Sequence, residues 1–124
     1  MCDIDIASTK YTPKIYMNAS KGLIEISGKS YPENTFEFYA PVIEWLENYF
    51  ENPKDTTTVN IEIIYFNSST SKFLFDFFDF LEENTTKSKI EINWIYDEEN
   101  ETALEAGEEF VEDFETLEIN LKTK

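Results

Sequence analysis

Histidine and arginine are absent from this 124-residue chain, and cysteine occurs once, at Cys2. Without histidine, the sequence has neither the usual general base near neutral pH nor the commonest ligand of transition metals. A single thiol can form neither a disulfide framework nor a zinc cluster. We therefore expect no catalytic activity, no bound metal and no cofactor, and the scarcity of cysteine favours a reducing, cytoplasmic setting.

Long apolar runs are also missing. No stretch approaches the roughly 20 apolar residues that span a membrane, and residues 1–20 lack the basic and apolar regions of a signal peptide. The sequence thus predicts a cytoplasmic protein without membrane insertion. Its length fits one domain over residues 1–124, and we find no internal repeat and no linker.

Positive charge is scarce: 10 lysines stand against 26 acidic residues, which gives a formal net charge of −16. Binding to nucleic acid needs a basic patch, so we do not expect this chain to bind nucleic acid directly. Aromatic residues, by contrast, make up 16% of the chain and include 11 phenylalanines. Disordered chains are poor in such residues, which indicates a packed acidic domain.

Alternating apolar and polar residues predict five strands, and apolar spacings of three and four predict three helices. We expect the strands at residues 14–18, 23–28, 58–66, 89–96 and 116–122, and the helices within residues 36–50, 71–84 and 97–118. Pro41 either divides the first helix or kinks it. The core face expected for that helix consists of Phe36, Tyr39, Ala40, Ile43, Leu46 and Phe50.

The order of these elements predicts the arrangement of the sheet. Strands that alternate with helices are joined by crossovers and are parallel, whereas the first two strands form an antiparallel hairpin. Four strands carry one polar face, and a sheet covered by helices on both sides would show continuous apolar runs instead. We therefore predict a two-layer α/β domain with a mixed five-stranded sheet and three helices on one face.

The segment YFNSSTSKFLF, residues 65–75, contains four consecutive hydroxyl residues between a strand and a helix. Asn67 and Ser68 fall at the carboxyl end of an inner strand and the amino end of the next helix. Ligands often bind at such junctions, and helix amino ends favour anions. A simpler interpretation is that Ser68 or Ser69 caps the helix, which is worth about 1 kcal/mol. The pattern alone favours this capping interpretation over an anion site, because capping serines are common at helix starts.

Three segments, TPKI, GLIEISGKSYPENTFEFYAPVIEWLENYF and IEIIYFNSSTSK, resemble successive blocks of the SiaC-type regulatory phosphoproteins. The resemblance extends from about Thr12 to Lys89, with SGKSYPEN and YFNSS as its specific motifs, and the acidic last third matches only in general pattern. It implies a STAS-like fold, similar to the anti-anti-sigma domain, and a non-enzymatic role.

In that family a dedicated protein kinase phosphorylates one hydroxyl, and a phosphatase of the PP2C type reverses the modification. The unmodified form binds and activates a diguanylate cyclase, so the resemblance implies partner switching in cyclic-di-GMP signalling and in the control of biofilm or aggregation. The phosphoacceptor is the residue directly after YFN, here Ser68, where the family usually has threonine. Ser69 and Thr70 are the fallback acceptors.

Partner contact is expected around this acceptor, at Tyr31, Pro32, Glu33, Asn34, Asn67, Ser69 and Lys72. The SYPEN block can equally serve only to turn the chain into the first helix. With no arginine present, Lys72 is the nearest cation in sequence that can hold a phosphate in cis. The apolar residues between Phe73 and Leu81 cover more than one helix face, so we expect one or two of these phenylalanines to be exposed for a partner.

Two rival functions come from other classes. An acidic inhibitor or immunity-type protein that occupies a basic cleft agrees with the charge and size, because electrostatic attraction would speed association. It leaves the hydroxyl run without a role. An enzyme that uses paired carboxylates, such as Glu25 and Glu62, is the weaker alternative, because acids on a polar sheet face are usually only solvated.

Overall fold

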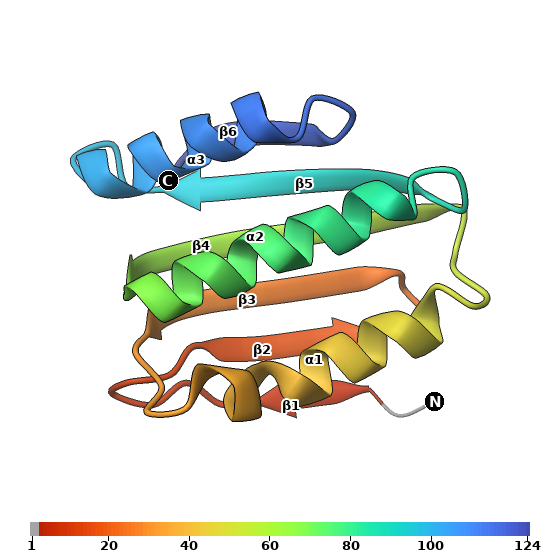
Figure 1. Cartoon of the computed structure of the whole chain (residues 1–124), viewed down its shortest axis with the longest axis horizontal. Helices are drawn as coiled ribbons and strands as arrows, with labels where there is room; N and C mark the ends of the chain where they lie inside the picture. The colour runs from red at the N-terminus through yellow and green to blue at the C-terminus, as the bar shows by residue number, and fades with distance from the viewer. Residues whose placement is uncertain (1–2) are drawn as a thin grey trace.

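The computed structural model describes residues 3–124, and Figure 1 shows a sheet crossed by three helices. Cys2 lies outside the described residues. The elements in chain order are β1 (Ile4–Ile6), β2 (Lys14–Asn18), β3 (Leu23–Ser30), α1 (Thr35–Tyr49), β4 (Thr56–Phe66), α2 (Ser68–Glu83), β5 (Lys89–Tyr96), α3 (Glu101–Asp113) and β6 (Glu118–Thr123).

The sheet has six strands in the order β1-β2-β3-β4-β5-β6, so the prediction of five strands was wrong. The missed strand, β1, has only three residues, too few to show alternation, and it pairs antiparallel with β2 at one edge. The predicted strand directions are confirmed: β2 and β3 form an antiparallel hairpin, and the strands from β3 to β6 are parallel. The sheet is therefore mixed.

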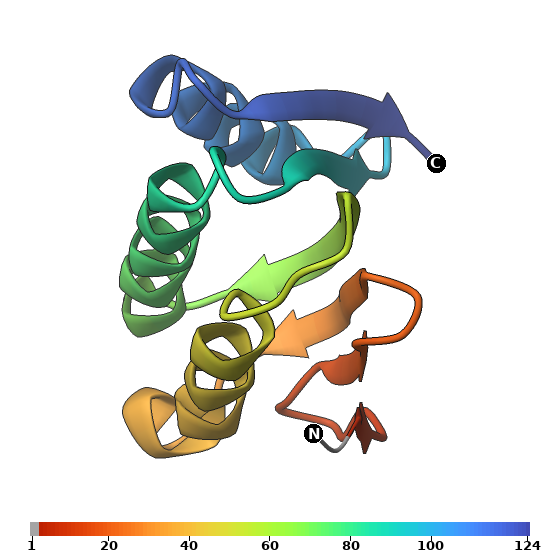
Figure 2. The same ribbon diagram turned by 90° about the vertical axis from the view of Figure 1, so that its right-hand side faces the viewer.

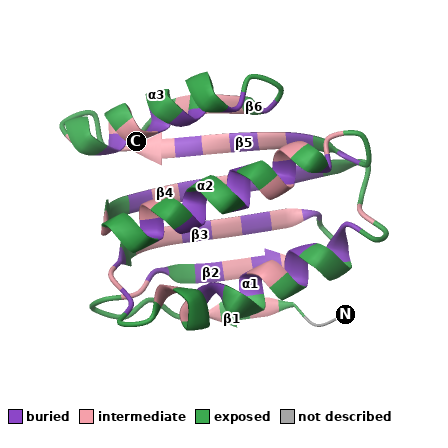
Figure 3. Cartoon of the chain, viewed as in Figure 1, coloured by how far each residue is buried: buried purple, intermediate pink, exposed green. Residues whose placement is uncertain are grey.

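All three helices lie on one face of the sheet, as the view from the side shows (Figure 2). The core is packed between the two layers, and each helix turns its buried residues toward the sheet and its exposed residues outward (Figure 3). Within residues 3–124, no helix covers the opposite face. This arrangement confirms the prediction of a two-layer domain, which rested on the polar alternation of the strands.

The open face carries a row of hydrogen-bonded side chains that crosses four strands. Asn60 Nδ2 donates to Glu25 Oε2 (3.1 Å), and Asn93 Nδ2 donates to Asn60 Oδ1 (2.8 Å). Asn120 Nδ2 donates in turn to Asn93 Oδ1 (3.4 Å). These residues are register partners on neighbouring strands, so the polar alternation seen in the sequence becomes a ladder on the sheet.

Helix α1 continues through Pro41 as one helix, and its buried face differs from the predicted one. The buried residues are Tyr39, Val42, Trp45, Leu46 and Tyr49, whereas Phe36 is 85% exposed and Ala40 is exposed. Tyr39, Leu46 and Phe50 are buried as predicted. The prediction failed for Phe36 and Ala40 because apolar residues occupy two stripes of the helix. One stripe packs on the sheet, and the other faces α2.

Helix α3 is shorter than the acidic segment that contains it, because its first and last turns are replaced by loops. Its buried residues, Ala103, Gly107 and Phe110, confirm that the charge run is the solvated face of a helix. Gly107 is required by close packing: a Cβ atom there would lie 2.6 Å from Trp94 Cδ1 and 2.7 Å from Leu121 Cδ2. The helix therefore approaches β5 and β6 more closely than any side chain would allow.

Candidate functional site

The hydroxyl run begins helix α2, but none of its members caps the helix. The cap is Asn67, whose Oδ1 accepts a hydrogen bond from the backbone N–H of Thr70 (2.9 Å). Ser68 is the first helical residue. The prediction that Ser68 or Ser69 caps the helix was therefore wrong, because an asparagine one position earlier already takes the free N–H group.

The four hydroxyl residues differ in exposure. Ser68 and Ser69 are exposed, Ser71 is half-buried, and Thr70 is completely buried. A modifying enzyme reaches exposed hydroxyls, so within this run the hydroxyls of Ser68 and Ser69 are the most accessible ones. Thr70 could serve as an acceptor only if the first turn of α2 opened.

Thr70 belongs to a buried network that joins three elements. Its Oγ1 lies 2.9 Å from Ser30 Oγ and donates to the carbonyl oxygen of Ser30 (3.2 Å) at the end of β3. Ser30 Oγ is also 2.6 Å from Tyr39 Oη of α1. Burial raises the pKa of Tyr39 to about 12, against the opposing effect of the hydrogen bond to Ser30, so the phenol is neutral at physiological pH.

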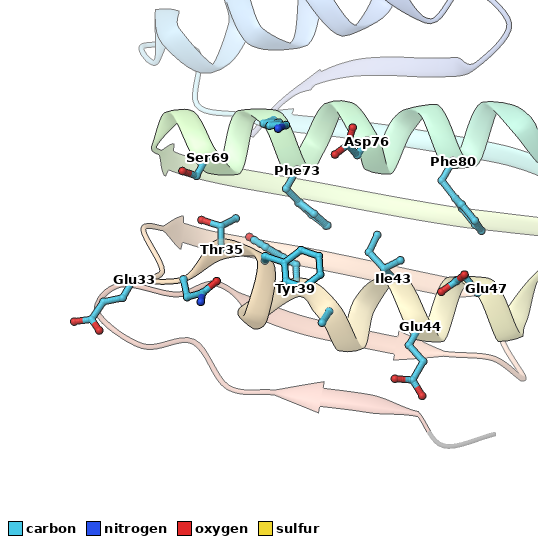
Figure 4. Close-up of a pocket in the computed structure, with 14 residues that line it drawn as sticks. Glu33, Thr35, Tyr39, Ile43, Glu44, Glu47, Ser69, Phe73, Asp76 and Phe80 are labelled. Carbon is cyan, nitrogen blue, oxygen red and sulfur yellow. The ribbon is translucent and has the colours of Figure 1, made fainter.

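A groove of about 940 Å³ runs between α1 and α2 (Figure 4). Phe73 and Phe80 of α2 point toward α1, and Ile43 of α1 points toward α2. The groove is lined by Glu33, Asn34, Thr35, Phe36, Tyr39, Ala40, Ile43, Glu44, Glu47, Ser69, Lys72, Phe73, Asp76 and Phe80. It is an apolar channel between acidic side chains, and Lys72 is the single cation that lines it.

One end of the groove gathers several of the predicted interface residues. Ser69 of α2 and Glu33 and Thr35 near the start of α1 lie at this end (Figure 4), and Asn34 and Lys72 also line the groove. Among residues 3–124, the ion pairs are Lys89–Glu91 and Lys124–Glu62, so Lys72 is not engaged by an acid within the described chain. It is therefore available to a ligand or partner.

The residues of the SYPEN block, 30–34, have two roles: some hold the turn into α1, and others line the groove. Pro32 is buried, and Asn34 caps α1 by accepting from the N–H of Glu37 (3.0 Å). Tyr31 is half-buried and its ring lies 5.6 Å from that of Tyr65, outside the groove. The block thus turns the chain into α1, as the simpler interpretation proposed, and it also presents two groove residues, Glu33 and Asn34.

Sequence reasoning missed the apolar part of the groove. Phe36 and Ile43 were assigned to the core face of α1, and Phe73 and Phe80 were not separated from the rest of the phenylalanine-rich helix. The excess of apolar positions on α2 was the available signal. The predicted exposure of a phenylalanine on this helix is confirmed, because Phe75 is 46% exposed, whereas its use by a partner stays a prediction.

The carboxylates of the open face form no catalytic pair. Glu25 accepts a hydrogen bond from Asn60, and Glu62 Oε2 pairs with Lys124 Nζ at 2.7 Å. Within residues 3–124, no group of three or more acidic or cysteine side chains is placed to hold a metal ion. None of the helices in that range is long and apolar enough to cross a bilayer.

Comparison with known proteins identifies the family. The model of the SiaC family regulatory phosphoproteins matches residues 6–124. The chain belongs to the SiaC family. It is accordingly a regulatory protein rather than an enzyme. The match includes the acidic last third, where the sequence had shown only a general similarity.

Individual relatives agree with this assignment. An uncharacterized protein of Pseudomonas aeruginosa strain UCBPP-PA14 is 34% identical over 114 residues, which cover 91% of this chain and 90% of the relative. The crystal structure of apo-SiaC from Pseudomonas aeruginosa superimposes with a TM-score of 0.90 at 31% identity, covering 98% of this chain and 99% of that one. The crystal structure of the diguanylate cyclase SiaD in complex with its activator SiaC, from the same species, contains a chain with a TM-score of 0.91 at 31% identity, covering 98% of this chain and all of that one.

Proposed function

We propose that this SiaC family member binds and activates a diguanylate cyclase when it is unmodified, and that phosphorylation of Ser68 ends the interaction. The observation that carries the proposal is the similarity to SiaC, which is the activator in the complex with the cyclase SiaD. Reversible control then requires a cognate protein kinase and a phosphatase of the PP2C type. The output is cyclic-di-GMP signalling that controls biofilm formation or aggregation.

The cyclase is proposed to contact the groove at the end where Ser69, Lys72, Glu33 and Asn34 lie. Phe36, which is 85% exposed at this groove, supplies an aromatic anchor of the kind that dominates protein interfaces. Apolar burial would provide affinity, and the acidic side chains along the groove would select a basic partner surface. Tyr31 and Asn67 flank this contact.

Phosphorylation of Ser68 is compatible with the fold and incompatible with the contact. A phosphate adds about −1.5 to −2 charges, and the amino end of α2 accepts an anion at a gain of up to about 1 kcal/mol. A partner that covers this end must remove water from the dianion, which costs several kcal/mol when no cation compensates. The penalty exceeds the gain, so the modified form releases the partner while the domain stays folded.

The wider setting follows from the same proposal. We propose that residues 1–124 act as one domain in the cytoplasm, where the cyclase would have access to its nucleotide substrate. The α/β sheet with three helices on one face supports a relationship to the STAS domain. No cofactor or metal takes part in the proposed switch.

The test is a comparison of two baits in cells of the source organism. The Ser68→Ala protein should retain a cyclase that the Ser68→Asp protein does not, and the intact mass of wild type should show a population heavier by about 80 Da. Equal recovery of the cyclase by both baits would contradict the switch. Capture of a basic nuclease by both, with no phosphorylated population, would instead support the acidic inhibitor.

A further inference from the structure

The two exposed serines lie between two residues that are tied to the same carbonyl group. The backbone N–H of Asn67 donates to the carbonyl oxygen of Ser30 (3.3 Å), and Thr70 Oγ1 donates to that same oxygen (3.2 Å). Asn67 and Thr70 are also bonded to each other, through Asn67 Oδ1 and the N–H of Thr70. The turn that carries Ser68 and Ser69 is therefore closed at both ends on β3.

This attachment is buried and specific. Thr70 and Ser30 have no exposed surface, and Ser30 Oγ bonds both Thr70 Oγ1 and Tyr39 Oη. The first turn of a helix lacks half of its backbone hydrogen bonds and tends to fray. Tertiary contacts from Asn67 and Thr70 oppose fraying at the position where the proposed acceptor begins the helix.

We propose that Thr70 is a positioning residue that selects the phosphoacceptor: its buried hydroxyl fixes the first turn of α2 so that Ser68 is presented to the modifying enzyme. The inference rests on the proposed function. In the modification, Ser68 Oγ bonds to the γ-phosphorus of a nucleoside triphosphate, the bond to the β-phosphate oxygen breaks, the hydroxyl proton passes to a base of the kinase, and the nucleoside diphosphate leaves. Such in-line transfer depends on a fixed acceptor geometry.

Removal of the Thr70 hydroxyl should therefore change where the phosphate goes. In Thr70→Val the shape of the side chain is kept, but the bonds to the carbonyl and Oγ of Ser30 are lost. The turn then samples several orientations, and Ser69 and Ser71 compete with Ser68. Thr70→Ser keeps the hydroxyl and should restore selection of Ser68.

The chain offers a matched control at the opposite end of the sheet. Thr57 is fully buried in a network of the same kind, with Oγ1 2.8 Å from Tyr49 Oη and 2.7 Å from Ser88 Oγ. Thr57→Val removes an equivalent hydroxyl from the core without touching α2. Both valine variants should lower Tm by about 3–6 °C, so a difference between them in phosphorylation is not caused by stability.

The experiment expresses each full-length variant in cells of the source organism and maps phosphate on residues 68–71 by mass spectrometry. Wild type, Thr70→Ser and Thr57→Val should carry phosphate on Ser68 alone. Thr70→Val should lose about 5- to 10-fold of its Ser68 occupancy and gain phosphate on Ser69 or Ser71. In the purified proteins, amide hydrogen exchange across residues 68–72 should be at least about fivefold faster in Thr70→Val alone.

The possible outcomes each support or overturn the positioning role of Thr70. Wild-type occupancy and position in Thr70→Val would overturn the positioning role, and so would an equal loss in Thr57→Val. If Thr70→Ser behaved like Thr70→Val, the hydroxyl would not be sufficient to fix the first turn of α2, and the inference would be wrong. If wild type carried no phosphate on residues 68–70, the proposed function itself would fail, and the inference would fail with it.

Discussion

The rings of Tyr39 and Phe73 stack with their centroids 3.8 Å apart and their planes 9° from parallel. Tyr39 belongs to α1 and Phe73 to α2, and both line the groove. Phe73 also follows Thr70 by about one helical turn, and the hydroxyl of Tyr39 bonds Ser30. Tyr39 therefore supports both the groove, through its stacking on Phe73, and the start of α2, through its hydrogen bond to Ser30.

If the cyclase binds in the groove, replacing Phe36 should weaken binding of the cyclase without lowering the stability of the domain. Because this ring is almost fully exposed, Phe36→Ala should change the free energy of unfolding by less than about 0.5 kcal/mol. Loss of an aromatic anchor should weaken cyclase binding by about 5- to 30-fold. Isothermal titration calorimetry with the purified cyclase and thermal melts measure the two quantities.

Phe75→Ala is the control for that experiment. Phe75 lies on α2 away from the groove, with its ring 5.1 Å from that of Phe114. Its removal should cost some stability and leave cyclase binding unchanged. If Phe75→Ala lost binding and Phe36→Ala kept it, the contact would lie on the side of α2 that faces α3.

The switch predicts that Ser68→Asp and Ser68→Ala fold equally well and bind differently. Both should melt within a few degrees of wild type, because position 68 is exposed and an acid at a helix amino end is tolerated. Ser68→Asp should weaken cyclase binding at least about tenfold, whereas Ser68→Ala should bind and resist the kinase. Asp carries less charge than a phosphate, so the phosphorylated protein itself should bind more weakly still.

The buried phenol of Tyr39 predicts a loss of stability in alkaline solution. Its pKa is about 12 in the folded chain, against 10.0 ordinarily. Between these values the unfolded chain releases the proton and the native chain keeps it, so the free energy of unfolding falls as the pH rises. The contribution, about 1–3 kcal/mol, is fully present below pH 10.

Urea denaturation of wild type and Tyr39→Phe at pH 9 to 11.5 isolates this contribution. The variant retains the ring and its stacking on Phe73 but has no proton to release. Its stability should fall less steeply than that of wild type above pH 10. Parallel curves would mean that the phenol ionises as readily in the native chain as in the unfolded one.

Close packing at Gly107 predicts that alanine is harmful there. Alanine favours helix over glycine by about 1 kcal/mol, but its Cβ would fall 2.6 Å from Trp94 Cδ1. Overpacking of this kind costs about 1–3 kcal/mol before the helix gain is counted, and Trp94 is held by its Nε1–H bond to the carbonyl of Ala103 (2.8 Å). Gly107→Ala should lower Tm, while Glu108→Ala, at an exposed neighbour, should not.

The strands and helices were largely predictable because alternation and helical spacing record which residues face the core. The failures have definite causes. β1 is too short for a pattern to appear, and α1 has a second apolar stripe that faces α2 rather than the sheet. A single sequence does not say which of two apolar stripes is covered, so Phe36 and Ile43 could not be separated from the core residues.

The sequence singled out the hydroxyl run at residues 68–71, but it did not predict how these side chains are arranged. The resemblance pointed to Ser68, and the position at a strand-to-helix junction agreed with it. The different environment of Thr70 depends on Ser30, which is 40 positions away in the chain. Serine and threonine are equally plausible as caps, acceptors or core residues, and only the folded arrangement distinguishes these roles.

The amide ladder on the open face also makes a shifted alignment of the parallel strands unfavourable. Asn60, Asn93 and Asn120 each have apolar neighbours in sequence, so a slip of one residue would break the row and turn isoleucine, leucine or tryptophan side chains toward water. The pairings of β4 with β5 and of β5 with β6 join segments that are distant in the chain, and such pairings form slowly. The face without helices thus distinguishes the correct register from a shifted one through its own side chains.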